Sequence, residues 1–368
     1  MRRRRHGLAL ALLLAGCGPP AEELAARLRD GAPEERRQAA EGLGRSGGPA
    51  AVGLLCAALD DVEWTVRVEA ARALGRIGAP EGIGCLTKAL ESDDVQIQLT
   101  AVKALAAIGR AAAGPMLAAL PRTRGPVRDA LAAAAGRVDD PRAVAPLRAL
   151  VARADGAENG AASGLVALGR PDVLLPFLEE PAGSPRRRAA ARALGMARDP
   201  ASLAALDRAL RRQDGTLDPD VALALVRRRR LDPLIAVLDA NAPAADRRVA
   251  ADALAASPER PAELALDRAV ARRDLAAVAG AHLRLIRQGR PQSEPLLLAA
   301  LAAGGDERMA VRFWECGNPR LAAAGKAWLE AHGLKEVGGR WVPAGFDYVI
   351  LPGATQAPRE PEVRWGRP

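Results

Sequence analysis

The stretch WTVRVEAARALGRIG at residues 64–78 decides the fold, because its pattern returns as VQIQLTAVKALAAIG at residues 95–109. The two stretches are in register at an offset of 31 residues, since Leu74 corresponds to Leu105. Apolar residues recur in them at helical intervals, and each ends in a glycine, which is typical of a helix end. The same columns continue upstream through Ala39, Leu43 and Gly47, through Leu24, Leu55 and Leu86, and through Leu28, Leu59 and Leu90. Three consecutive units therefore share one template of two amphipathic helices.

Prolines extend this periodicity along the chain. Proline favours the first turn of a helix, where its missing N–H needs no partner. The hexapeptide AARALG of residues 70–75 also returns unchanged at residues 190–195. We therefore predict about ten helix pairs between Ala21 and Asn318. The prolines that we expect to open helices are Pro49, Pro80, Pro141, Pro171, Pro200, Pro233, Pro261, Pro291 and Pro319.

A helix pair of about thirty residues cannot bury its apolar face alone, so neighbouring pairs stack into a solenoid. The unit resembles the HEAT repeat, particularly the short bacterial PBS lyase HEAT-like type. The resemblance rests on Leu59-Asp60-Asp61, on Val66-Arg67 and on the segment Ala70 to Gly75. Gln98 stands where the next unit would carry the arginine. The predicted fold class is all-α, an α-solenoid over residues 21–318.

The N-terminal segment resembles a bacterial lipoprotein signal. Arg2 to Arg5 form a basic region, Leu8 to Leu14 a short apolar region, and Leu14-Ala15-Gly16-Cys17 resembles a lipobox. The resemblance implies removal of residues 1–16 and lipidation of Cys17, with residues 17–20 as a short tether. The alternative is a cysteine that happens to follow an ordinary signal or anchor. The four arginines would leave with the signal, and the formal net charge would fall from +9 to +5.

These features predict a bacterial cell-envelope protein that is anchored to the membrane by its lipid. Gly18 follows the cysteine, and this favours the periplasmic face of the outer membrane over the inner membrane.

Outside the cytoplasm disulfides are permitted. Cys56 and Cys85 lie on the first helices of adjacent units, 29 residues apart against a repeat of 31. We expect buried thiols, with a bridge as the alternative, and no partner in the chain for Cys316.

No residue constellation predicts catalysis, a metal ion or a cofactor. His282 and His332 have no metal-ligand spacing around them and are interpreted as structural. The acidic pairs Asp60-Asp61, Asp93-Asp94 and Asp139-Asp140 are expected to recur at one place in the repeat, the turn before or between helices. Aspartate there caps the helix and opposes its dipole. We therefore expect a protein that is not an enzyme.

Runs of arginine offer a candidate interaction surface. A solvated face is the default interpretation, and the alternative is a basic strip that binds acidic partners or lipid headgroups. Nucleic acid is not expected, because almost no aromatic residues interleave the arginines to stack bases. The candidate residues are Arg186, Arg187, Arg188, Arg227, Arg228, Arg229 and Arg230.

The C-terminal end differs in composition, since seven of the nine aromatic residues follow residue 312. A turn at Gly317-Asn318-Pro319 should lead into a closing helix, and LKEVGGRWVP at residues 334–343 predicts a hairpin. We interpret residues 319–353 as a cap that seals the last repeat. A partner-binding patch that includes Trp341 and Tyr348 is the alternative. Residues 354–368 have the composition of a disordered tail.

The function predicted from the sequence is a lipid-anchored, non-enzymatic scaffold that binds another protein of the cell envelope. Stacked repeats present a long surface without a deep enclosed pocket. The alternative is a lyase-like or chaperone-like HEAT protein that acts on an envelope protein or a cofactor, because some HEAT-like proteins resemble bilin lyases.

Overall fold

The computed structural model describes residues 20–46, 48–181, 183–240 and 242–344, in two units that divide between Ala197 and Arg198. The predicted signal at residues 1–16, Cys17, Tyr348 and the predicted tail at residues 354–368 lie outside the described residues. No helix of the described part is long and apolar enough to span a membrane.

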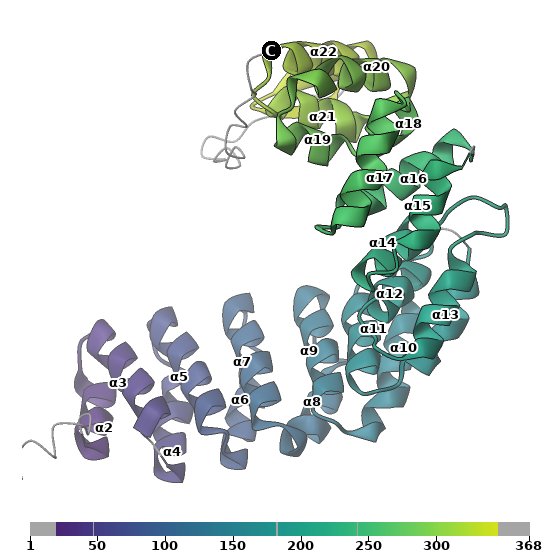
Figure 1. Ribbon diagram of the computed structural model, residues 1–368. Coiled ribbons are helices and arrows are strands. Elements are labelled where there is room, and N and C mark those ends of the chain that lie inside the picture. The colour runs from purple at the N-terminus through teal and green to yellow at the C-terminus, as the bar shows by residue number, and fades with distance from the viewer. Residues whose placement is uncertain (1–19, 47, 182, 241, 345–368) are drawn as a thin grey trace, which may run out of the picture. The chain divides into compact units, whose positions relative to one another are not determined.

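The first unit consists of six repeats, each with a first and a second helical element (Figure 1). Short 3-10 turns lead into three of the first helices: η1 (Pro80–Gly82), η2 (Arg110–Ala112) and η3 (Pro141–Ala143). Every second helix packs on the next one along the chain. The pairs are α2 (Ala21–Asp30) with α3 (Pro33–Ser46), α4 (Pro49–Ala58) with α5 (Trp64–Ile77), α6 (Ile83–Ala89) with α7 (Val95–Ile108), α8 (Ala113–Ala119) with α9 (Gly125–Arg137), α10 (Val144–Arg153) with α11 (Glu158–Ala167), and the 3-10 helix η4 (Pro171–Glu179) with α12 (Pro185–Leu194).

The second unit adds four repeats and the C-terminal cap. Its pairs are α13 (Pro200–Ala209) with α14 (Pro219–Arg227), α15 (Asp232–Asp239) with α16 (Ala244–Ala255), α17 (Arg260–Ala271) with the broken helix α18 (Leu275–Gly280) and α19 (His282–Gln288), and η5 (Pro291–Ser293) and α20 (Glu294–Gly304) with α21 (Glu307–Glu315). The cap is α22 (Pro319–Ala331) with strands β1 (Leu334–Val337) and β2 (Arg340–Pro343). The described chain therefore holds the ten predicted helix pairs.

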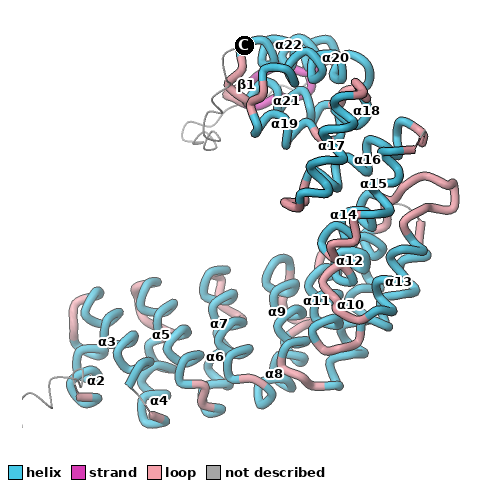
Figure 2. The backbone as a smooth tube through the Cα atoms, in the orientation of Figure 1, coloured by secondary structure: helices cyan, strands magenta, loops and turns pink. Residues whose placement is uncertain are grey.

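The predicted α-solenoid with a small C-terminal hairpin is confirmed. In Figure 2 helices run through both units, and the strands form one hairpin beside α22. Leu334 pairs with Pro343 and Val337 with Arg340, so the turn falls on Gly338-Gly339 as predicted. The predicted prolines stand at the first or second position of their helices.

Local sequence explains where the helices begin and end. The carboxylate of Asp94 accepts hydrogen bonds from the N–H groups of Gln96 and Ile97 at the start of α7, as expected of a cap. Asp140 does the same for η3. Gly78, at φ 68°, ends α5 in the left-handed conformation that glycine adopts without strain. The core between the helix rows consists mainly of alanine and leucine.

Candidate functional site

Arg187 is buried, which contradicts its prediction as an exposed interaction residue. Its guanidinium donates hydrogen bonds to the carbonyl oxygens of Leu178 and Glu180, at 2.9 Å for Glu180. Only 7% of the residue is exposed. Arg187 thereby fastens the start of α12 to the end of η4, and it is a structural residue.

The repeat explains this placement. Arg187 stands three residues before AARALG, which is where Arg67 stands in the quoted stretch. Arg67 likewise donates to the carbonyl oxygens of Asp61 at 2.7 Å and Val62 at 3.0 Å. A carbonyl oxygen that loses its water on burial needs such a donor.

Arginines at the same place in other repeats form ion pairs with the following repeat of the same unit. Arg36 and Arg128 pair with carboxylates of the following repeat, Asp61 and Asp155, both at 2.8 Å. Arg247 does so in the second unit, with Asp274 at 2.7 Å. We call these residues the ladder arginines: Arg36, Arg67, Arg128, Arg187 and Arg247. In place of an arginine, Gln98 donates to Leu90 O at 2.8 Å.

Four of the other arginines in the two runs have local partners. Arg186 pairs with Glu180 at 2.9 Å, Arg229 with Glu259 at 3.2 Å, and Arg230 with Asp207 at 3.7 Å. Arg228 donates to Asp199 O at 3.3 Å. The two runs belong to different units. An interaction role stays a prediction for the half-buried Arg186 and Arg228 and for the exposed Arg188, Arg227, Arg229 and Arg230.

Trp341 is part of the packing of the cap. Its ring meets that of Trp314 edge to face, with centroids 5.6 Å apart. Its indole N–H is buried without a hydrogen-bond acceptor among the described residues. Trp328 stacks on His332, which directly follows α22. The half-buried Trp341 therefore supports the interpretation of the hairpin as a cap.

The surroundings of His282 also indicate a structural role. His282 is buried, its Nδ1 lies 2.7 Å from Ala279 O, and burial lowers its pKa. The neutral form is therefore favoured at pH 7. Among the described residues no group of three or more His, Cys, Asp or Glu could hold a metal ion.

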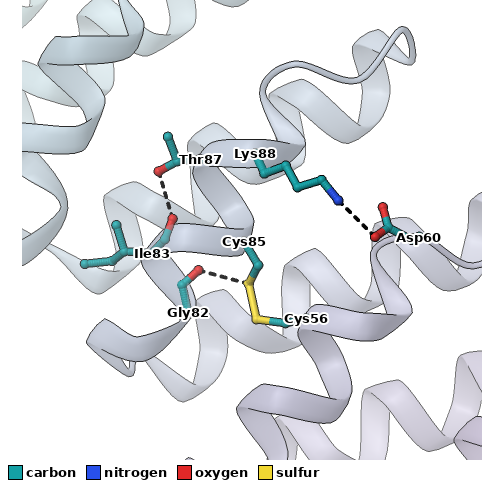
Figure 3. The surroundings of a disulfide bond; sticks show 7 residues. All are labelled: Cys56, Asp60, Gly82, Ile83, Cys85, Thr87 and Lys88. Atoms are coloured by element: carbon teal, nitrogen blue, oxygen red, sulfur yellow. Dashed lines mark hydrogen bonds and ion pairs between the residues drawn. A yellow bond between two sulfur atoms is a disulfide. The ribbon is translucent and has the colours of Figure 1, made fainter.

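Cys56 and Cys85 form a disulfide between α4 and α6, which corrects the expectation of separate buried thiols (Figure 3). Their Cα atoms are 5.6 Å apart, and both residues are half-buried. The predicted thiol of Cys316 is free and buried, and burial raises its pKa.

Helix geometry explains the correction. Equivalent positions on stacked helices point in the same direction, so a bridge needs positions on opposite sides of the template. A shift of two residues rotates a side chain by about 200° around a helix. The difference between the spacing of 29 residues and the repeat of 31 therefore turns one thiol towards the other. The prediction of separate thiols took the same difference as a reason against a bridge.

A basic groove lies between the second helices α5 and α7, and the sequence analysis missed it. It encloses about 290 Å³. Arg72 and Arg76 come from α5 and Lys103 from α7, while Gly75 and Ala104 lie where the two helices touch. The signal was available in the register, because Arg72 and Lys103 occupy one column, 31 residues apart. We call the cavity bounded by Arg72, Gly75, Arg76, Gln96, Thr100, Lys103, Ala104 and Ala107 the α5–α7 groove.

Comparisons with known proteins identify two repeat segments. A sequence family of HEAT repeats matches residues 21–97, and the PBS lyase HEAT-like repeat matches residues 186–212. The chain therefore contains HEAT and PBS lyase HEAT-like repeats. No curated protein matches it significantly.

Several solved structures are similar at low identity. The complex of CpcE and CpcF of phycocyanin lyase from Nostoc sp. PCC7120 is 22% identical over 78% of this chain and 96% of that chain, with a TM-score of 0.30. An engineered protein is 20% identical over 84% and 98% of the respective chains, also at 0.30. A designed armadillo repeat protein is 17% identical over 71% and 100%, at 0.25.

Proposed function

We propose that this chain is a non-enzymatic scaffold that uses its HEAT repeats to bind another protein. The observation that carries the proposal is the row of second helices in the first unit. Each of these helices packs on the next one, and each carries exposed residues, so the row forms one long face. Such a face offers many repeated contact points, whereas small-molecule sites are usually deep and largely apolar. The α5–α7 groove is small, and five of its eight lining residues carry charged or polar side chains.

We further propose that the scaffold is lipid-anchored through Cys17 in the bacterial cell envelope, at the periplasmic face of the outer membrane. The lipobox-like residues before Cys17 and the glycine after it support this location. The Cys56–Cys85 disulfide supports it independently, because disulfides rarely persist in a reducing cytoplasm.

Cross-linking in intact cells, followed by mass spectrometry, tests the scaffold. We expect cross-links from the second-helix face of the first unit to one protein, and their loss when that protein is deleted. Turnover of a substrate by the purified chain, without any cross-linked protein, would refute the proposal.

A separate experiment tests the anchor. Cys17→Ser should abolish labelling by a fatty-acid analogue and release the protein from the membrane fraction, because a single cysteine carries the lipid. A Cys56→Ser variant is the matched control and should stay labelled and bound. Retention of the unlabelled Cys17→Ser protein in washed membranes would show that something other than lipid holds it.

The runner-up is a lyase-like or chaperone-like protein that acts on an envelope protein or a cofactor. The PBS lyase HEAT-like match at residues 186–212 favours it. Transfer of a chromophore to an acceptor protein by the purified chain would support this alternative.

A further inference from the structure

We propose that the α5–α7 groove binds an acidic, extended segment of the partner protein. This inference rests on the proposed scaffold function and names the chemistry of one of its contacts. The groove lies on the uncovered face of repeats two and three, where α5 packs on α7.

The charge of the groove is positive because its cations outnumber its carboxylates. Arg76 and Arg72 share one buried carboxylate, that of Glu69, at 2.6 Å and 3.5 Å. Lys103 forms no ion pair with any residue that the structure describes. Three cations therefore face one carboxylate, and this excess is matched by two acidic side chains of a ligand.

The buried carboxylate also positions the two guanidinium groups. Only 7% of the Glu69 side chain is exposed, whereas Arg72 and Arg76 are 56% and 40% exposed. The buried carboxylate of Glu69 thus pairs with both arginines while part of each guanidinium group stays exposed to solvent. A fixed guanidinium can bind a carboxylate with two hydrogen bonds, and it loses less entropy when it does so.

The spacing of the cations fits an extended chain. Arg72 and Arg76 are one helical turn apart, with Cβ atoms about 5–6 Å from each other. Alternate side chains of an extended segment point to the same side and are about 6.6 Å apart. Two ligand carboxylates separated by one residue can therefore pair with both arginines. Lys103, on the opposite side of the groove, can pair with a third carboxylate.

The floor of the groove makes it shallow enough for a peptide. A Cβ added to Gly75 would lie 2.8 Å from Ala104 Cα, so α5 and α7 approach closely there. Gln96 adds a side-chain amide at the rim, which can bind a peptide carbonyl or N–H. No aromatic residue lines the groove, so stacking of nucleic acid bases is not provided for.

The test uses the full purified chain and two fluorescein-labelled peptides, (Glu-Ser)4 and (Lys-Ser)4. Fluorescence anisotropy should show binding of the acidic peptide only, weakening with salt because the attraction is screened. Arg72→Glu combined with Lys103→Glu should weaken binding at least tenfold. Lys88→Glu is the matched control, because Lys88 belongs to the same repeat but lies on α6, 72% exposed and paired with Asp60. It should change the affinity less than twofold.

Circular dichroism of each variant confirms that it is folded. The inference is overturned if the folded double variant binds as tightly as the control, or if the acidic peptide fails to bind the unaltered chain. Stronger binding of a single-stranded oligonucleotide would assign the groove to nucleic acid instead. Full displacement by millimolar inorganic phosphate would reduce the groove to a small-anion site. The scaffold proposal fails separately, on the absence of cross-links in cells.

Discussion

Repeats two and three (α4 to α7) and repeats four and five (α8 to α11) follow one template, yet different contacts join the members of each pair. The disulfide joins the first helices of repeats two and three, and the α5–α7 groove lies between their second helices. In repeats four and five, glycines let α9 and α11 touch backbone to backbone, since a Cβ at Gly136 would lie 2.0 Å from Gly164 O. The paired glycines bring the backbones of α9 and α11 together, whereas long side chains surround the glycine–alanine contact of α5 and α7.

The largest expected effect follows from filling the glycine contact. Gly136→Ala places a methyl group against the backbone of Gly164, so α9 and α11 must separate. We expect the free energy of unfolding to fall by more than about 3 kcal/mol, at the upper end of overpacking effects. Urea denaturation followed by circular dichroism measures it, and hydrogen exchange should locate the loss in α9 and α11.

Gly84→Ala is the matched control for this substitution. Gly84 lies inside α6 with open space where the Cβ would go. Alanine there should leave stability unchanged or raise it by up to about 1 kcal/mol, because it restricts the unfolded chain. Equal losses from both variants would show that glycine contacts do not distinguish the two pairs of repeats.

The next effect concerns the disulfide of repeats two and three. Replacing both Cys56 and Cys85 by Ser should lower the free energy of unfolding by about 3 kcal/mol, because the bridge closes a loop of about 30 residues. Reductant should bring the unaltered chain to the same midpoint and leave the variant unaffected. A midpoint insensitive to reductant would mean that the ladder arginines and the core suffice.

A smaller loss should follow from removing a ladder arginine. Arg187→Ala leaves the carbonyl oxygens of Leu178 and Glu180 without this donor, at a cost of about 2 kcal/mol. The exposed neighbour offers the control, since Arg188→Ala should change stability by less than about 0.5 kcal/mol. A larger loss of stability in Arg188→Ala than in Arg187→Ala would contradict the structural role of Arg187.

The smallest effect concerns Asp129 in the α9–α11 contact. It accepts a hydrogen bond from Gly160 N at 2.6 Å, and burial raises its pKa. The Asp129 carboxyl group therefore binds a proton more readily in the folded state than in the unfolded state. The protonated group stabilises the folded state in acid, and this stabilisation is lost as the pH rises through the raised pKa. Asp129→Asn should be slightly more stable than the unaltered chain at pH 7. Thermal melts should show this advantage shrinking towards pH 3, and an advantage that grows in acid would contradict the assignment.

The sequence predicted what depends on one residue column at a time. Leu74 and Leu105 recur at 31 residues and identify helix pairs, and Gly338-Gly339 identifies the hairpin turn. What it did not predict depends on two columns seen together. The disulfide requires positions on opposite sides of the template helix, and the α5–α7 groove requires Arg72 and Lys103 to be read across neighbouring helices. Arg187 was mispredicted for a related reason. The run of three arginines suggested a solvated surface, whereas Arg187 shares its place in the repeat with Arg67, which also donates to carbonyl oxygens.

The disulfide also determines how far the chain can be stretched. The bond excludes from extension the 29-residue interval between Cys56 and Cys85. At about 3.5 Å for each extended residue, this interval corresponds to about 100 Å of contour length. When the chain is pulled from its two ends, the oxidised form should rupture at an extension shorter by this length than the reduced form. Reduction or oxidation of this bond would then change the length to which the molecule can be stretched without altering any side chain of the α5–α7 groove.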